Sequence, residues 1–430
     1  MMEDWKRRVC VTGMGVRTSI GSDVAEFAAA LRAGSCGIRD LGGTAPGHLC
    51  APLPPLSLRD SLQRLPLVPK PLGSRALACA GRAPLAAQVA VQCALEAWGQ
   101  AGLFQHAIDP ATVSLVVAGQ NIQPAYAYGL HEKFRSAPDY LPPSYALHFL
   151  DSDHLGILSE LLEIHGEGLT AGGASASGNV GIIQGMRQIR AGLCEVCVVV
   201  GALADLSPME LQALHGIGAL GGRGPDATAQ AACRPFDADR DGFIYGQGAG
   251  CLILESEASA KRRGAAVLAQ LAGGAIRLDG SRLASPSQAG EALAMRCALR
   301  DAGLQPQDID YINAHATSTV AGDLTETLAI KEVFGDSLSR VLINATKGLT
   351  GHCLWSAGVI EAIATIIQLR DGFVHPNLNL LRPIASDCRF VGAQSDQAPL
   401  RTALSNSFGF GGINTAVAIT RALGPHGEEG

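Results

Sequence analysis

An α/β fold is predicted by two observations. Short runs of aliphatic residues, each long enough for one buried strand, alternate along the chain with segments that have the spacing of helices. Hydrophobic residues make up 47% of the 430 residues and aromatic residues only 5%, so the chain can bury a large core that must be mainly aliphatic. The 52 glycines indicate many tight turns between the elements. The alternation occurs twice, which indicates two similar halves, residues 1–255 and 256–430.

In the first half, a strand near Val9–Thr12 precedes a helix near Val24–Arg32. Gly34 is expected to end that helix because glycine readily adopts the left-handed conformation of a helix C-terminus. A later helix, Val180–Arg190, is too apolar on every face to lie at the surface, so we expect it at the centre of the protein. The other predicted elements of this half are strands at Val113–Val117 and Val196–Gly201 and a helix at Ile157–Ile164.

The second half repeats the scheme after a strand near Gly250–Leu254. A long apolar helix is predicted at Ala357–Leu369, with Gly372 as its stop signal. The other predicted elements are strands at Val267–Leu271, Ile309–Asn313 and Val341–Ile343 and a helix at Ala289–Ala302.

Two proline-rich stretches interrupt this pattern. Thr44–Pro71 contains seven prolines and is predicted to be a surface excursion without regular elements, as either a cap or a disordered linker. Pro138–Pro143 is a second, shorter interruption of the same kind.

Composition excludes several classes of function. The net charge of −6 leaves no basic stripe for nucleic acid, and no run reaches the roughly 18 apolar residues of a membrane span. Met1–Arg8 is too polar for a signal peptide, so a cytoplasmic location is expected. The twelve cysteines have no repeating spacing and are expected to be reduced. Cys194 and Cys197 form a C-x-x-C, but in an expected strand they would point to opposite faces, so we expect no metal.

Five sequence blocks are candidates for a functional site. In Gly172–Asn179, Ser175 lies within a run of small residues. The other four are, in order, Arg234–Gly242, Asn313–Thr319 with Gly322, Asp323 and Glu326 behind it, Thr346–His352, and Asn406–Gly412. In order and rough spacing these blocks resemble those of the β-ketoacyl synthase family of the thiolase superfamily, from Val9 to Ile419. The resemblance implies the thiolase fold, with five α-β-α-β-α layers built from two pseudo-duplicated halves, and a homodimer.

Ser175 aligns with the cysteine that accepts the acyl group in these synthases. A thiolate is largely formed near neutral pH, and the positive end of a helix lowers its pKa further, whereas a serine hydroxyl stays protonated without a strong base beside it. No Asp, Glu, His or Lys lies between Thr170 and Gln184, although a base distant in sequence remains open. We therefore expect Ser175 to be a pocket residue of the active site and not an acyl carrier.

The other half of ketosynthase chemistry, decarboxylation of a malonyl thioester, needs no nucleophile. It needs donors that hold the thioester oxygen while negative charge develops there as an enolate. The resemblance assigns this role to His315 and His352, and it makes Lys347 the organiser of the histidines. Thr317 and Thr319 resemble the hydroxyls that lie beside the malonyl carboxylate.

Three aromatic residues are expected at the substrate pocket. Phe408 matches the family's gating phenylalanine, with packing in the core as the alternative, and Phe410 follows it in the same glycine-rich loop. Trp355 stands where the family has a small residue. It either fills the tunnel that a long acyl chain would occupy or anchors the packing away from the pocket.

The segment Gly201–Gly221 resembles the Cys-to-Ser ketosynthase homologues of polyketide β-branching cassettes. This implies decarboxylation of malonyl on an acyl carrier protein without condensation, followed by an HMG-CoA-synthase-like enzyme. The substrate would be carried on phosphopantetheine, and no other cofactor is implied. A Ser175-dependent acyltransferase and a non-catalytic partner like a chain-length factor are the alternatives. Basic residues that could meet an acidic carrier are Arg64, Lys70, Arg75, Lys261, Arg262 and Arg263.

Overall fold

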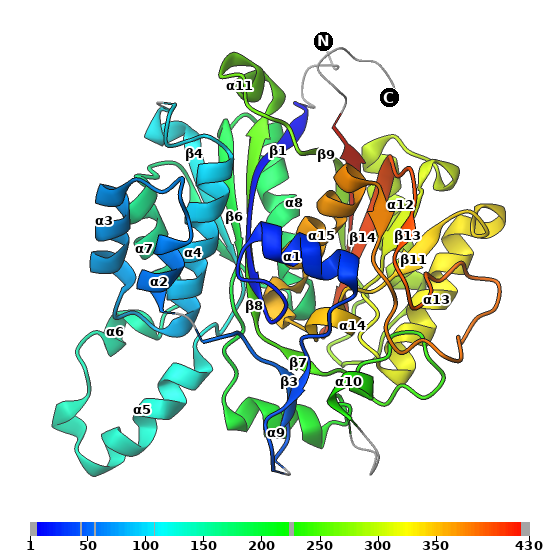
Figure 1. Cartoon of the computed structure of the whole chain (residues 1–430), viewed down its shortest axis with the longest axis horizontal. Coiled ribbons are helices and arrows are strands. Elements are labelled where there is room, and N and C mark those ends of the chain that lie inside the picture. The colour runs from blue at the N-terminus through cyan, green and yellow to red at the C-terminus, as the bar shows by residue number, and fades with distance from the viewer. Residues whose placement is uncertain (1–6, 44, 56, 107, 223–227, 423–430) are drawn as a thin grey trace.

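The computed structural model describes residues 7–422 except 44, 56, 107 and 223–227. Its main sheet has ten strands in the order β11-β10-β14-β15-β9-β1-β8-β6-β4-β5 (Figure 1). Residues 9–11 of β1 pair with residues 269–271 of β9 and thereby join two five-stranded halves. The strands are β1 Val9–Thr18, β4 Val113–Ala118, β5 Gly168–Ala171, β6 Val196–Gly201, β8 Gly248–Ser256, β9 Ala269–Leu278, β10 Tyr311–Asn313, β11 Leu342–Asn344, β14 Thr402–Gly409 and β15 Ile413–Arg421.

The two halves of the sheet have the same internal pattern. In each, the three strands at the outer edge are parallel to one another, and the next two are antiparallel to their neighbours. This repeat agrees with the pseudo-duplication expected from the sequence. The boundary between the halves that was predicted from the sequence, between residues 255 and 256, lies directly before Ser256, the last residue of β8.

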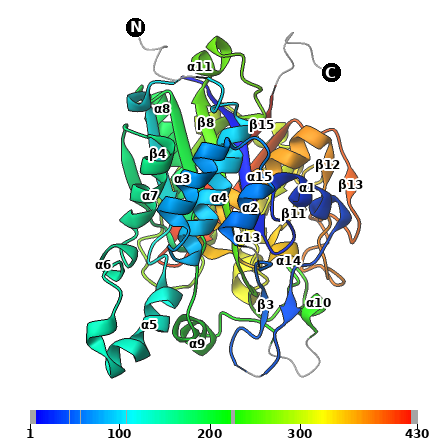
Figure 2. The same cartoon turned by 60° about the vertical axis from the view of Figure 1, so that its left-hand side comes forward.

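Helices complete five layers. Two helices, α8 and α15, pack between the halves of the sheet, and others cover the two outer faces (Figures 1 and 2). Strand β6 is therefore buried on both sides: Val196, Val198 and Val200 pack toward the outer helices while Cys197 and Val199 face the central ones. The longer helices are α1 Val24–Ala33, α3 Lys70–Ala80, α4 Leu85–Gln100, α5 Pro124–Ser136, α7 Ser152–Leu162, α8 Ser177–Arg190, α9 Pro208–Gly216, α12 Gln288–Ala302, α13 Val320–Phe334 and α15 Ala357–Asp371.

Several short helices and strands lie outside the main sheet and its longer helices. The helices among them are α2 Leu58–Gln63, α6 Tyr145–His148, α10 Ala229–Ala232, α11 Glu257–Arg262 and α14 Lys347–Thr350, and the strands are β2 Arg39–Asp40, β3 Leu49–Ala51, β7 Tyr245–Gly246, β12 Phe373–Val374 and β13 Asp396–Gln397. Within the part of the chain described, no helix is long and apolar enough to cross a membrane.

The central helices begin with equivalent tight turns. Ala174 and Leu354, both with positive φ (47° and 50°), each open a 3-10 turn that leads directly into α8 or α15. A non-glycine residue in this conformation costs on the order of 1–3 kcal/mol, so the surrounding packing must hold both turns. By this correspondence, Trp355 occupies in the second turn the place that Ser175 occupies in the first.

The prediction for Thr44–Pro71 was wrong. This stretch contains β3, all of α2 and the start of α3. Ser57 caps α2 by accepting a hydrogen bond from the Asp60 amide, and Pro71 lies in the first turn of α3, where proline is tolerated. The prolines separate the elements and do not interrupt them.

Strand β1 is longer than predicted. Gly13 and Gly15, which lie beyond the predicted end of the strand near Thr12, continue the strand to Thr18. A Cβ atom on Gly13 would lie 2.1 Å from the Ala97 carbonyl oxygen, and one on Gly15 would lie 2.0 Å from that of Cys93. Both glycines therefore allow α4 to pack closely against the strand.

The orientation expected for Cys194 and Cys197 was also wrong. Cys194 precedes β6, and both residues lie in the same buried cluster beside α8. The Cys197 thiol hydrogen-bonds the Cys194 sulfur, and this bond is the main cause that lowers the pKa of Cys194. All twelve cysteines are free thiols.

Candidate active site

A cavity of about 980 Å³ opens where the two halves meet. Its wall comes from both central turns, from α9, from the start of α13 and from the loop after β14. It is lined by eight of the nine residues selected from the sequence: Ser175, His315, Thr317, Thr319, His352, Trp355, Phe408 and Phe410. The ninth, Lys347, is buried behind this wall.

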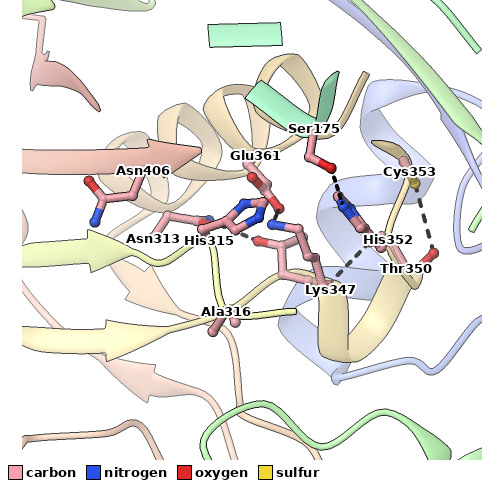
Figure 3. Close-up of polar contacts among 12 residues, drawn as sticks. Ser175, Asn313, His315, Ala316, Lys347, Thr350, His352, Cys353, Glu361 and Asn406 are labelled. Carbon is pink, nitrogen blue, oxygen red and sulfur yellow. Dashed lines mark hydrogen bonds and ion pairs between the residues drawn. The ribbon is translucent and has the colours of Figure 1, made fainter. Parts of the chain in front are cut away.

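Ser175 and His352 are in direct contact. The Ser175 Oγ lies 2.8 Å from the His352 Nε2, although the residues are 177 positions apart in the sequence (Figure 3). The polar partner of Ser175 is thus a histidine from the second half, and its role as donor or acceptor depends on which ring nitrogen holds the proton.

The backbone around His352 determines which ring nitrogen holds the proton. The Leu354 amide donates a hydrogen bond of 3.4 Å to the His352 Nδ1, so that nitrogen is the acceptor. Burial lowers the pKa of His352 well below its usual range, and the Lys347 ammonium lowers it further, so the ring is neutral at pH 7. The single ring proton is therefore on Nε2, which donates to the serine oxygen.

His315 faces the same region of the cavity. Its ring centroid is 5.6 Å from that of His352, with the ring planes nearly perpendicular at 83°. Burial is the first cause that lowers the pKa of His315 well below its usual range, followed by the charge of Lys347 and by His352. The His315 Nδ1 is buried without a hydrogen-bond partner among the described residues. The site thus contains two neutral imidazoles.

Lys347 is held by an acid that the sequence analysis missed. Its Nζ donates to the Glu361 Oε1 at 2.5 Å, and both side chains are fully buried. Burial raises the pKa of Glu361 to about 7, against the opposing charge of Lys347. The sequence did contain a signal for Glu361, because it is an acidic residue within the apolar run that forms α15.

A second buried acid fixes the loop that carries His315. Glu326 accepts hydrogen bonds from the amides of His315 (2.9 Å) and Ala316 (2.7 Å) and from the Asn406 Nδ2 (3.0 Å). This carboxylate ties the His315 loop to β14. The sequence analysis quoted Glu326 with its block but gave it no role.

The glycine-rich loop after β14 lies directly against the serine turn. A Cβ atom on Gly409 would lie 2.4 Å from the Gly173 carbonyl oxygen, so only glycine fits there. Phe408 is buried, with its ring 5.6 Å from that of His315, whereas Phe410 is exposed at the cavity wall. The hydroxyls of Thr317 and Thr319, two further residues of the cavity wall, hydrogen-bond each other at 3.0 Å.

Trp355 belongs to the cavity wall and is not a distant packing anchor. It packs against a small buried cluster that includes Phe243, Tyr245 and Leu354. Its Nε1 is buried and has no hydrogen-bond partner in the described chain. Trp355 and His352 thus line the same cavity.

The six basic residues considered for carrier binding do not form one patch. Helix α11, which contains Lys261 and Arg262, lies at the end of the molecule opposite α9, a wall of the cavity (Figures 1 and 2). Arg263 directly follows α11, whereas Arg64 follows the last residue of α2, and Lys70 and Arg75 lie in α3. Arg64, Arg75 and Arg263 are each in an ion pair with a glutamate. The described residues include no cluster of three or more His, Cys, Asp or Glu arranged to hold a metal ion.

Sequence comparison matches nearly the whole chain to one family. Residues 6–260 match the β-ketoacyl synthase N-terminal domain, and residues 268–381 match the C-terminal domain. The polyketide biosynthesis malonyl-ACP decarboxylase PksF of Bacillus subtilis (strain 168) is 38% identical over 415 residues, which are 96% of each chain. The chloroplastic 3-oxoacyl-(acyl-carrier-protein) synthase I of Hordeum vulgare is 34% identical over 435 residues, covering 97% of this chain and 89% of the relative.

Solved structures agree with this match. The ishigamide ketosynthase/chain length factor superposes with a TM-score of 0.83 at 29% identity, covering 97% of this chain and all of the other. A type II polyketide ketosynthase solved in complex with its acyl carrier protein, AntDE:AntF, gives a TM-score of 0.81 at 27% identity, with 97% of this chain covered. These structures confirm the predicted ketosynthase fold. The chain belongs to the β-ketoacyl synthase family.

Proposed function

We propose that this protein decarboxylates malonyl on an acyl carrier protein to acetyl without forming a new carbon–carbon bond. The observation that carries the proposal is the direction of the Ser175–His352 hydrogen bond. His352 is a donor to the position that a nucleophile would occupy, so it is set to stabilise an oxyanion and not to activate the serine. The similarity to PksF, a malonyl-ACP decarboxylase by name, supports the same activity.

In this mechanism the thioester oxygen of the malonyl group accepts hydrogen bonds from His352 and His315. The bond between the carboxylate carbon and the α-carbon breaks, carbon dioxide leaves, and the electron pair becomes an enolate whose charge is on that oxygen. A proton from solvent then adds to the α-carbon and gives acetyl. Donors placed where charge develops are each typically worth a factor of about 100 to 1000 in rate.

The remaining residues position this pair. Burial favours the neutral form of both imidazoles, and the charge of Lys347, which is fixed by Glu361, adds to this effect. Glu326 fixes the His315 loop. Thr317 and Thr319 are assigned to the malonyl carboxylate, and Phe408 to the gate of the cavity. Trp355 reduces the space available to a longer acyl chain.

A Ser175-dependent acyltransferase is the second candidate, and the 2.8 Å contact between Ser175 and His352 favours it. A serine–histidine pair acts as nucleophile and base when a third group, usually a carboxylate on Nδ1, holds the base tautomer. Here a backbone amide occupies Nδ1 and favours the opposite tautomer. Intact mass of the protein after incubation with acyl-carrier would reveal an acyl-Ser175 adduct if this candidate were correct.

The wider setting is also proposed. We place the protein as a cytoplasmic homodimer, divided into halves at residues 255/256, in a polyketide β-branching pathway, where an HMG-CoA-synthase-like enzyme would use the acetyl-carrier. A non-catalytic partner like a chain-length factor would have no need of two neutral histidines at a shared cavity. No cofactor is proposed beyond the phosphopantetheine arm of the carrier.

Mass spectrometry of the carrier arm tests the proposed activity. Malonyl-carrier should become acetyl-carrier, with or without an acyl primer. Arms that stay malonylated, or that gain a β-ketoacyl mass when a primer is present, would contradict it.

A further inference from the structure

A buried acid lies in the wall of the cavity, apart from the two histidines and Lys347. Glu291, in the first turn of α12, is only 1% exposed and lines the cavity. Its Oε2 has no hydrogen-bond partner among the described residues. A buried polar oxygen is costly without a partner, so this arrangement indicates a partner that enters the cavity with the substrate.

The first turn of α12 lies against the strands that carry Phe408. Phe408 of β14 is paired with Asn414 of β15, and residues opposite each other on antiparallel strands point to the same face of the sheet. On that face α12 meets the Asn414 side chain, because a Cβ atom on Gly290 would lie 2.7 Å from the Asn414 Nδ2. The Phe408 ring is 5.6 Å from the ring of His315. Glu291 therefore lies on the Phe408 side of the histidines.

The same face of α12 meets the polar contacts that fix the His315 loop. Met295 lies four residues after Glu291, and residues four apart share one face of a helix. The Met295 sulfur is 3.4 Å from the Asn406 Nδ2, which also donates to Glu326. Glu291 thus extends the row of side chains behind His315 into the wall of the cavity.

Glu291 holds its proton at neutral pH. Burial is the first cause that raises the pKa of this carboxyl well above its usual range, and the carboxylates of Glu326, Asp279 and Asp323 raise it further. A protonated carboxyl has an O–H to donate, whereas a carboxylate can only accept. A carboxyl that its surroundings keep protonated is suited to act as a general acid.

The other acids that line the cavity are already hydrogen-bonded. Three of them accept bonds of 2.9, 3.0 and 2.7 Å, namely Glu210, Asp241 and Asp279. Of the four acids in this wall, Glu291 is the one with a buried oxygen that lacks a partner in the described chain. The two histidines are neutral, and neutral imidazoles are very weak acids. Glu291 is therefore the group in this wall that is best suited to release a proton.

We propose that Glu291 is the proton donor to the α-carbon of the enolate that decarboxylation leaves, an inference that rests on the proposed function. After carbon dioxide has left, the enolate carbon takes the proton of the Glu291 carboxyl. A C–H bond forms, the O–H bond breaks, and the negative charge moves from the enolate oxygen to the Glu291 carboxylate. Water then returns a proton to Glu291, so solvent is the source of the new hydrogen in acetyl. His352 and His315 keep their protons throughout.

The isotope content of the new C–H bond tests this role. Acetyl-carrier formed in a one-to-one mixture of H2O and D2O contains hydrogen and deuterium in a ratio that depends on the donor, since donors differ in how they discriminate between the isotopes. Mass spectrometry at short reaction times, before the α-hydrogens of malonyl exchange, measures this ratio. Glu291→Gln has nearly the shape of the neutral acid but cannot release a proton, so water must supply it.

In Glu291→Gln the ratio should differ from that of the parent. The kcat should fall by at least about 100-fold while KM stays within about twofold, because a general acid acts in the reaction and not in binding. Glu291→Asp keeps an acid and should regain part of the rate.

Glu332→Gln is the matched control, since Glu332 is an acid of α13 outside the cavity wall, and it should change neither the ratio nor the rate. An unchanged isotope ratio in Glu291→Gln would overturn the proposal at any turnover rate, because a purely structural role slows the reaction without changing the donor. A parent that leaves malonyl-carrier unconverted would reject the proposed function and this inference with it.

Discussion

Ser175 Oγ and His352 Nε2 lie 2.8 Å apart, and the Leu354 amide at Nδ1 places the shared proton on the histidine. The serine is therefore the acceptor in this pair. A thioester oxygen in the same place would receive the same hydrogen bond. The arrangement provides the donor that an enolate requires, and it leaves the serine without the base that acyl transfer requires.

Exchange of the serine for cysteine should restore acyl loading. A thiol at the start of α8 would meet the positive end of the helix, which favours the thiolate, and thiolates attack thioesters readily. Ser175→Cys should form a covalent adduct with an acyl-carrier or a thiol-directed inhibitor, detected by intact mass, whereas the parent should not. Labelling of the twelve native cysteines is assigned by peptide mapping in both proteins. A Ser175→Cys variant whose introduced thiol stays unmodified would show that the turn does not activate a nucleophile.

The protonation of His352 should depend on Lys347. Burial is the first cause that lowers the pKa of both histidines, and the Lys347 charge is the second, so Lys347→Met should raise these pKa values part of the way toward the ordinary value of about 6.5. In the parent, NMR of labelled histidine should find His352 neutral, with its proton on Nε2, from pH 8 down to pH 6. In the variant the ring should begin to titrate at a higher pH. A His352 that titrates near pH 6.5 in the parent would be inconsistent with the donor role.

The buried pair of Lys347 and Glu361 should be important for stability. Glu361→Gln leaves a fully buried ammonium without its carboxylate, and breaking such a pair typically costs about 3–5 kcal/mol. Urea unfolding at pH 8, above the pKa of about 7 for Glu361, should register this loss. The control is Glu332→Gln, which removes an exposed pair with Arg296 and should cost no more than about 1 kcal/mol. Equal losses in the two variants would mean that the buried pair has no special role.

Trp355 should limit the length of the acyl group. In the Ser175→Cys background, adding Trp355→Ala should allow longer acyl-carriers to load the introduced thiol, because the cavity that Trp355 lines gains the volume of the indole. Intact mass across a series of acyl chain lengths measures this limit. An unchanged limit would indicate that other residues define the end of the cavity.

Aliphatic strands and a central apolar helix give strong periodic signals, which were sufficient for the α/β class and for many of the elements. The five-layered thiolase fold was predicted from the resemblance of the sequence blocks to the family. The sequence was not sufficient where packing between segments that are distant in the sequence determines the local structure. Gly13 and Gly15 lie beyond the predicted end of the first strand, but they continue β1, where their lack of a Cβ atom allows α4 to pack against the strand. The prolines of Thr44–Pro71 suggested an irregular loop, although they lie between short elements or, for Pro71, in the first turn of α3.

In the candidate site, too, the sequence identified some residues, whereas the contacts between them depend on the fold. Motifs identified Ser175, His315 and His352, yet the contact between Ser175 and His352 spans 177 positions and follows from the meeting of the two halves. Glu361 gave no motif signal, and only the fold shows that it faces Lys347. The proton on the His352 Nε2 depends on a backbone amide, which no residue type encodes. The roles of these residues stay predictions until they are tested.

The most direct test of the central claim is the rate of acetyl-carrier formation by Ser175→Ala and His352→Ala, measured side by side with the parent on malonyl-carrier. If donors and not a nucleophile drive the reaction, Ser175→Ala should keep a substantial part of the activity. His352→Ala should then be slower by at least about 100-fold while the protein stays folded, as should His315→Ala. An inactive Ser175→Ala together with near-normal turnover by His352→Ala would contradict the mechanism.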